Sequence, residues 1–106
     1  MRTRDYDRVY RQPARRQGSK HFLVVARRNE RGQTRWGISV KVRLGGAVVR
    51  NRLRRRLREM LRRAQQRLPA GWDVVVQPRR SEVASADFAA LRRELELLLE
   101  KTLHEG

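Results

Sequence analysis

The sequence predicts an α+β fold in which helices stack on a single mixed β-sheet. Segment 34–40 alternates apolar and polar residues, which is typical of a half-buried strand. Segment 73–77 has a continuous apolar centre, which indicates a strand covered on both faces. Segments 48–67 and 85–103 repeat apolar residues every three or four positions, as amphipathic helices do. With 106 residues, the chain fits one domain, 1–106.

The first element is a short helix over residues 5–11. It places Tyr6 and Tyr10 one turn apart on one face of the helix. Pro13 ends this helix, and we interpret residues 14–19 as a basic connector.

Two strands follow the connector. The apolar run 21–26 predicts the first strand, and segment 34–40 is the second. Between them, Asn29 and Gly32 tolerate the left-handed backbone angles that tight turns need. Residues 29–32 therefore predict a hairpin that pairs the two strands.

Residues 48–67 predict a helix with one apolar stripe and a wide arginine surface, entered through a basic glycine loop, 43–46. At about 100° per residue, the apolar side chains fall on one side of the helix. They are Val49, Leu53, Leu57, Met60, Ala64 and Leu68. One face of the helix can therefore pack on a core while the other presents guanidinium groups to a partner.

The last strand and helix follow a stop signal at Pro69 and Gly71. Strand 73–77 is expected at the centre of the sheet, and residues 78–84 form a loop. Ser85 is the expected N-cap of the final helix. Its apolar stripe is Phe88, Leu91, Leu95 and Leu98. The order of elements is α-β-β-α-β-α.

The net charge is +16, from 27 basic and 11 acidic residues. Residues 41–67 hold eleven basic residues and one acidic residue, whereas residues 81–106 hold three basic and six acidic ones. At this charge density, nucleic acid is the expected partner, and the C-terminal segment should face away from it. Arginine supplies 24 of the basic residues, which suits phosphate binding, although a GC-rich genome would give the same bias.

The sequence contains no pattern that predicts catalysis or metal binding by the protein. It has no cysteine, and His21 and His104 fit neither a catalytic triad nor a metal site. No apolar run approaches the roughly 20 residues of a membrane span, and the N-terminus lacks the apolar core of a signal peptide. We expect a cytoplasmic binding protein with no catalytic residue, no metal ligand and no membrane partner.

One motif in the basic region is specific. A strand ending in Gly37-Ile38-Ser39-Val40 leads through Gly45 into Arg50-Asn51-Arg52, followed by Arg54-Arg55 and Arg58-Glu59. Together with the N-terminal tyrosine pair and the strand at 71–76, this pattern resembles the protein subunit of bacterial ribonuclease P. The resemblance covers roughly residues 4–103.

The resemblance implies a two-layer sandwich with a mostly antiparallel, four-stranded sheet that includes one short extra strand. It also implies a left-handed β-α-β crossover and a ribosomal-protein S5 domain 2-like architecture. The implied function is that of the protein component of an endoribonuclease, which binds a catalytic RNA in a 1:1 complex and the 5′ leader of precursor tRNA. The RNA would be the catalyst and would hold Mg²⁺, so no cofactor is expected on the protein.

The same resemblance assigns two sets of binding residues. Those for the catalytic RNA are Arg43, Arg50, Asn51, Arg52, Arg54, Arg55, Arg58 and Arg62. Those for the leader are Tyr6, Tyr10, Phe22 and Val24. For Asn51, a helix cap or a local hydrogen bond is the alternative, and both tyrosines could instead pack the first helix on the sheet. Which face of the strand 21–26 meets the leader depends on a register that the sequence leaves open.

Two positions depart from the family pattern. Val42 stands where the family usually has one of two adjacent lysines, and Pro13 replaces a common glycine. Two other functions remain as alternatives, a structural ribosomal protein and a DNA-binding regulator. The second is disfavoured because a strand and a glycine loop occupy the place of the first helix of a helix-turn-helix motif, so DNA is not an expected partner.

Overall fold

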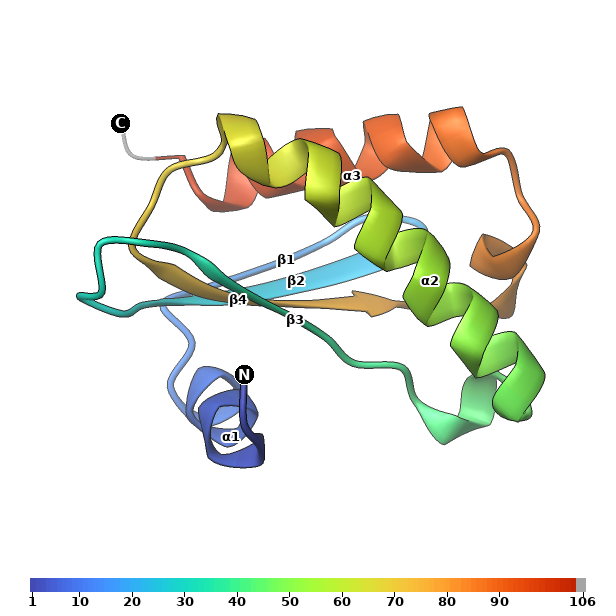
Figure 1. Ribbon diagram of the computed structural model, residues 1–106, viewed down its shortest axis with the longest axis horizontal. Coiled ribbons are helices and arrows are strands. Elements are labelled where there is room, and N and C mark those ends of the chain that lie inside the picture. The colour runs from blue at the N-terminus through green and yellow to red at the C-terminus, as the bar shows by residue number, and fades with distance from the viewer. Residues whose placement is uncertain (105–106) are drawn as a thin grey trace.

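In this computed structural model, which describes residues 1–104, a four-stranded sheet has two helices on one face and a third helix on the other (Figure 1). The order of strands across the sheet is β1-β2-β4-β3. The strands are β1 (Arg15–Gly18), β2 (Phe22–Arg28), β3 (Arg35–Ile38) and β4 (Trp72–Pro78). The helices are α1 (Thr3–Arg11), α2 (Ala47–Ala64) and α3 (Phe88–Thr102).

Strand β4 lies at the centre of the sheet, as its apolar sequence predicted. It pairs antiparallel with β2 and parallel with β3, and all seven of its residues are buried. The predicted hairpin between β2 and β3 is therefore wrong, because β4 lies between them. Inserting β4 there buries the apolar run Val74–Val76 on both faces of the sheet, whereas a β2–β3 hairpin would leave this strand at an edge.

The turn at residues 29–32 still reverses the chain. Glu30 and Gly32 have positive φ angles of 57° and 74°, and Asn29 Oδ1 accepts a hydrogen bond from the backbone of Arg31 at 2.9 Å. The backbone N–H of Asn29 donates to Gly71, just before β4, so the loop spans the width of one strand.

Residues 14–19 are not the connector that we predicted, because Arg15–Gly18 forms strand β1. It pairs antiparallel with β2, and backbone bonds at both ends extend the pairing, from Ala14 to Ala26 and from Ser19 to Phe22, each 2.9 Å long. β1 contains no apolar residue, so hydrophobic alternation could not reveal it. The antiparallel pairs β1–β2 and β2–β4 confirm the mostly antiparallel sheet and its short extra strand.

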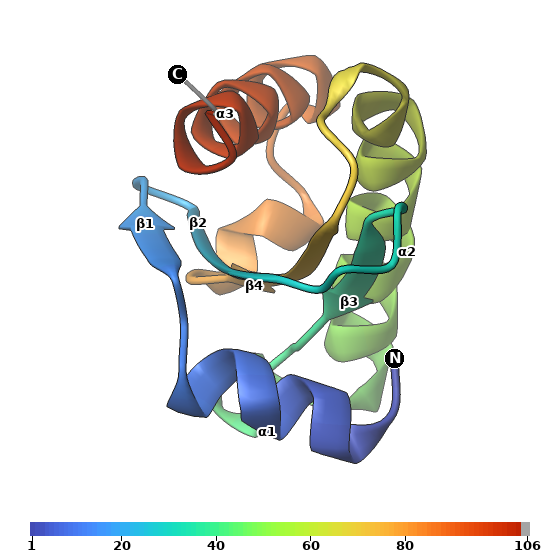
Figure 2. The same cartoon turned by 90° about the vertical axis from the view of Figure 1, so that its left-hand side faces the viewer.

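Strands β3 and β4 are parallel neighbours joined through α2, and this crossover is left-handed (Figures 1 and 2). Most parallel crossovers are right-handed. The unusual hand agrees with the fold that the family resemblance implies.

The two faces of the sheet are covered unequally. Helices α2 and α3 pack on one face, in a core that contains Leu57 and Val74, both 0% exposed. Helix α1 packs on part of the other face, where Val9 meets Val25 and Val75. No helix within residues 1–104 has the length and apolar content to cross a membrane.

Helix α3 begins later than predicted. Asp87 is its N-cap, since Asp87 Oδ2 accepts a hydrogen bond from the backbone of Ala90 at 2.9 Å. Ser85 is not the cap, because a 3₁₀ turn at Ser81–Ala84 extends into it through a bond from its N–H to Glu82.

Candidate nucleic-acid interface

Helix α2 packs one side on the core and exposes arginines on the other. The predicted apolar stripe is buried at Leu53, Leu57, Met60 and Ala64, and Leu61 joins it. Most of the residues predicted to bind RNA are exposed, with Arg50 and Arg54 half-buried. We call this group the α2 surface: Arg50, Asn51, Arg52, Arg54, Arg55, Arg58 and Arg62.

The side chain of Asn51 has a local partner within the α2 surface. Asn51 Oδ1 accepts a hydrogen bond of 3.1 Å from Arg54 Nη1. This bond goes to a side chain rather than to the helix backbone, so Asn51 helps to orient a guanidinium group. Its amide N–H₂ can still donate to a ligand.

Helix α2 carries one acidic residue, Glu59. It bonds to Arg62 at 2.7 Å and lies 3.7 Å from Arg63, and the hydrogen bond from Arg62 lowers the pKa of Glu59. Arg55 and Arg58 form no hydrogen bond or ion pair with any residue in the described part of the chain. Their charges are therefore available to phosphate groups.

Another arginine of α2, Arg56, makes contacts within the protein. Arg56 donates a 2.7 Å hydrogen bond to the carbonyl of Ala86, and its guanidinium lies 5.5 Å from the ring centre of Phe88. These contacts join α2 to the start of α3. The arginines of α2 thus divide into a structural member and a solvent-facing group.

Arg43 lies apart from the α2 surface. It is in a 3₁₀ turn, Val42–Leu44, and lines a groove of about 480 Å³ at the sheet face that α1 also covers. Sequence reasoning missed the other residues of this sheet groove, because they come from three strands and two loops. Its lining is Arg16, Gly18, Leu23, Lys41, Arg43, Gln77, Pro78 and Arg79.

Phe22 and Val24 lie inside the protein, where no RNA strand can contact them, so the prediction that they bind the leader is wrong. Both are 0% exposed and pack in the core under α2 and α3. Alternate residues of a strand point to opposite faces, and Leu23 and Val25 therefore face the α1 side. The register that the sequence left open thus puts Leu23, not its neighbours, at the groove.

The two tyrosines of α1 are each partly packed and partly exposed. Both contact the small cluster around Val9 and Val25. Tyr10 also accepts a hydrogen bond on its hydroxyl from Gln77 Nε2, next to the sheet groove. The two alternatives left open for the tyrosines, packing and binding, are therefore compatible.

Helix α1 is fastened to the sheet by two carboxylates that share one arginine. Arg35 bonds to Asp73 at 2.6 and 2.8 Å and to Asp5 at 3.3 Å. The backbone bond from Arg2 and the charge of Arg35 lower the pKa of Asp5. Burial alone would raise the pKa of Asp73, but hydrogen bonds from Arg35 and Asn29 bring it below its ordinary value.

These two carboxylates do not fit a magnesium ion, because the guanidinium of Arg35 binds oxygens of both. Mg²⁺ needs oxygen ligands that are free to coordinate it. Within residues 1–104, no cluster of three or more histidine, aspartate or glutamate side chains has the arrangement of a metal site.

His21 joins the start of β2 to α3. Its Nδ1 lies 2.7 Å from Glu94 and its Nε2 lies 3.0 Å from Glu82. Burial raises the pKa of Glu94, but hydrogen bonds from His21 and Ser19 outweigh it and leave that pKa lowered. His21 therefore links the start of β2 to α3 and to the 3₁₀ turn before it.

Comparison with known proteins gives one consistent result. The family model described as Ribonuclease P matches residues 1–103. The ribonuclease P protein component of Syntrophus aciditrophicus is 36% identical over 98 residues, which cover 92% of this chain and 81% of that protein. The one from Thermotoga sp. strain RQ2 is 38% identical over 86 residues, or 78% of this chain and 74% of that protein.

A solved structure from the same family has the fold of this chain. The ribonuclease P protein from Thermotoga maritima superposes with a TM-score of 0.87 at 34% identity, covering 100% of this chain and 97% of that one. The chain therefore belongs to the bacterial ribonuclease P protein family, as the protein component that partners ribonuclease P RNA in tRNA processing.

Proposed function

We propose that the protein holds the catalytic RNA on the α2 surface and the 5′ leader of precursor tRNA in the sheet groove. The observation that carries this proposal is that two basic surfaces lie on opposite faces of one sheet. The α2 surface belongs to a helix packed on one face (Figure 1). The sheet groove is lined by residues of the other face. One rigid body can therefore position two RNA segments at the same time.

The α2 surface suits a folded RNA. Arginine forks neutralise phosphates and release their counterions, which gives affinity and fixes orientation without reading sequence. Arg52, Arg55 and Arg58 are exposed and have no acidic partner among the described residues. The α2 surface would therefore fix how the protein sits on the RNA.

The sheet groove suits an unpaired strand. Four basic residues surround it, while Leu23 and the nearby Tyr10 add apolar and aromatic surface. Grooves that bind single-stranded nucleic acid combine these two features, because cations follow the backbone and aromatic rings stack on bases. A 5′ leader, unlike the folded body of a tRNA, offers such a strand.

In this proposal the RNA subunit cleaves the phosphodiester bond and holds Mg²⁺, in a 1:1 complex with the protein in the cytoplasm. Four of the protein's carboxylates are already engaged and fit this proposal: Asp5 and Asp73 bind Arg35, Glu59 binds Arg62, and Glu94 binds His21.

A cleavage assay tests the proposal. Precursor tRNA is incubated with its catalytic RNA at low Mg²⁺, with and without the protein. We expect the protein to raise both substrate affinity and cleavage rate, and native mass spectrometry to give one protein per RNA. Unchanged affinity and rate, together with co-sedimentation of the protein with ribosomal subunits, would favour a structural ribosomal protein instead.

A further inference from the structure

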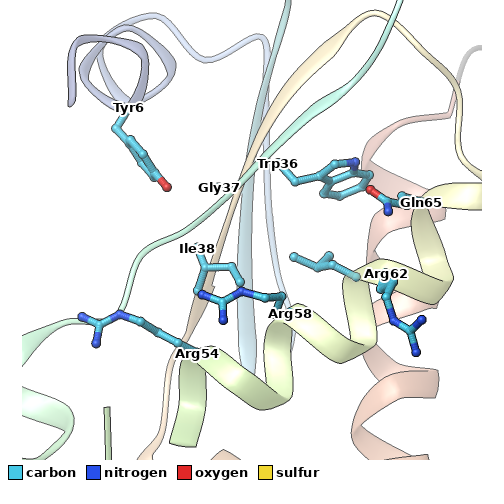
Figure 3. Close-up of a pocket in the computed structure, with 9 residues that line it drawn as sticks. Tyr6, Trp36, Gly37, Ile38, Arg54, Arg58, Arg62 and Gln65 are labelled. Atoms are coloured by element: carbon cyan, nitrogen blue, oxygen red, sulfur yellow. The ribbon is translucent and has the colours of Figure 1, made fainter. Parts of the chain in front are cut away.

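A second cavity, distinct from the sheet groove, opens where α1, the edge of β3 and α2 meet (Figure 3). Its volume of about 380 Å³ is in the range of small-molecule sites. Tyr6 reaches toward it from α1, Trp36 and Ile38 lie on β3, and Arg54, Arg58 and Arg62 line it from α2. We call it the edge pocket.

Backbone N–H and C=O groups of β3 that form no hydrogen bond to a neighbouring strand face the edge pocket. β3 is the last strand of the sheet, so one of its sides is open. The N–H of Ser39 donates to Val76, and in a ladder alternate residues point the same way. The N–H and C=O groups of Trp36 and Ile38 therefore point toward the open side. Such groups can pair with the hydrogen-bonding edge of a base.

The walls of the edge pocket are partly aromatic. Trp36 is half-buried, with part of its indole packed on the core, and lies beside Gln65 (Figure 3). Tyr6 is half-buried against Gly37, where an added Cβ would lie 2.7 Å from two carbons of the ring. Gly37 thus lets the tyrosine ring reach the strand. Flat side chains of this kind stack on unpaired bases.

The third side of the edge pocket is basic. Arg54, Arg58 and Arg62 recur every four residues, so they lie on one side of α2, and no acidic residue lines the pocket. Arg58 has no hydrogen bond or ion pair with another residue of the range 1–104. Guanidinium groups in this arrangement bind phosphate oxygens.

We propose that the edge pocket binds one unpaired nucleotide of an RNA, with its base at the β3 edge between Tyr6 and Trp36 and its phosphate on Arg54 and Arg58. A strand from another protein chain would also match the β3 edge. The three arginines and the net charge of +16 favour the polyanion. The identity of the ligand as RNA rests on the proposed function.

Titration of the ¹⁵N-labelled protein with the four nucleoside 5′-monophosphates, followed by NMR, tests this inference. Ribose 5-phosphate is the control that lacks a base. We expect the nucleotides to shift the amide signals of Trp36 and Ile38 and the indole N–H of Trp36, whereas ribose 5-phosphate leaves these signals in place. Equal shifts with ribose 5-phosphate would mean that the pocket binds phosphate alone, and this result overturns the proposal.

Two arginine variants sharpen the test. Arg58→Ala should weaken nucleotide binding by about tenfold or more, the loss expected when a hydrogen bond to a charged group is removed. Arg93→Ala removes an exposed arginine of α3 and should leave binding unchanged. If Ile38 shifts with protein concentration in the absence of nucleotide, a second copy pairs with the β3 edge and the proposal is wrong.

The outcome can be separated from that of the cleavage assay. If the protein stimulates cleavage but no nucleotide shifts Trp36 or Ile38, the edge pocket is not a nucleotide site and the proposed function stands. If nucleotides bind there but cleavage is unaffected, the edge pocket is a nucleotide site, while the proposed function and with it the ribonuclease P RNA as the source of that nucleotide are overturned.

Discussion

The two faces of the sheet use the same strands but differ in what covers them. Under α2 and α3, 18 buried residues of the described chain form one core, whereas under α1 only three do. The larger core supplies most of the hydrophobic stabilisation. On the α1 face Val25 and Val75 are buried beneath the helix, but Leu23 stays partly exposed. A surface that binds single-stranded RNA needs accessible apolar side chains of this kind.

The attachment of the helices differs in kind as well. Helix α2 is held by buried leucines, while α1 depends on Val9 and on the ion pairs of Arg35. Regions with few buried apolar contacts open at lower free energy than the core. The comparison therefore predicts that changes in the core under α2 cost the most stability and that changes where α1 attaches cost less and loosen mainly that helix. Changes to exposed side chains on either face should affect RNA binding instead.

The largest effect is expected on the α2 face. Leu57→Ala should lower the free energy of unfolding by about 2–5 kcal/mol, because it leaves a cavity in a fully buried site. Urea denaturation measures this loss. Leu97→Ala is the matched control, since Leu97 is 61% exposed and its change should stay within about 0.5 kcal/mol. Similar losses in both variants would show that the burial of Leu57 adds no particular stability to the larger core.

The ion pairs that Arg35 forms with Asp5 and Asp73 should make the free energy of unfolding depend on pH. The pKa of Asp73 in the folded protein is below the ordinary value of 3.8, so in acid the unfolded chain binds more protons than the folded one. The stabilisation is complete above pH 3.8 and is lost as the pH falls through the lowered pKa. Asp73→Asn should therefore cost about 1.5–3 kcal/mol at pH 7 and less in acid. Urea curves at pH 7 and pH 3 test this, and a constant difference would refute it.

Gly37→Ala should loosen α1 without disturbing the larger core. The added Cβ would lie 2.6 Å from Met1 Cε and 2.7 Å from the Tyr6 ring, so these side chains must move and the packing of α1 is disturbed, at a cost of about 1–3 kcal/mol. Hydrogen exchange should speed up in α1 more than in α2. Gly46→Ala, whose added Cβ meets no atom within 4 Å, should leave the exchange of α1 unchanged.

Tyr10→Ala should weaken binding of precursor tRNA that carries a leader by about 1–3 kcal/mol, the value of one stacked base. Binding of leaderless tRNA should not change. Tyr10→Phe keeps the ring and removes the hydroxyl that accepts from Gln77, so it should retain most of the affinity. Equal losses with and without the leader would show that Tyr10 acts only by packing α1.

The smallest expected effect is on how RNA affinity depends on salt concentration. Arg55→Ala should reduce the slope of log affinity for the catalytic RNA against log salt by about one, as expected for one lost phosphate contact. Arg56→Ala should leave that slope unchanged and lower stability, because Arg56 binds Ala86 and Phe88 within the protein. Binding measured at several salt concentrations separates the two residues.

The elements that the sequence predicted well are those with a strong local pattern. The stripes of α2 and α3 and the apolar run of β4 each follow from neighbouring residues, and the structure contains all three. β1 has no apolar residue, and it forms a strand by hydrogen bonding to the open edge of β2. The order of strands depends on whether β3 or β4 pairs with the free edge of β2. The sequence of one segment alone cannot decide this.

The binding residues show the same limit. The spacing of apolar residues around Arg50 predicted which side chains of α2 are exposed, since a helix fixes which side chains share a side. Phe22 and Val24 were misassigned because a strand offers two faces and its own residues do not say which face the helices will cover. The family resemblance grouped Arg43 with the arginines of the helix, whereas the structure places it at the sheet groove.

The insertion of β4 between β2 and β3 has a consequence for how the chain is made. Synthesis proceeds from the N-terminus, so the whole of α2 emerges before Trp72–Pro78, the strand that joins the other two. Until then β3 has no partner, and the arginines of α2 leave the ribosome on a chain whose sheet is incomplete. Contacts between such distant segments slow folding, so this protein acquires its polyanion-binding shape only after most of it has been translated.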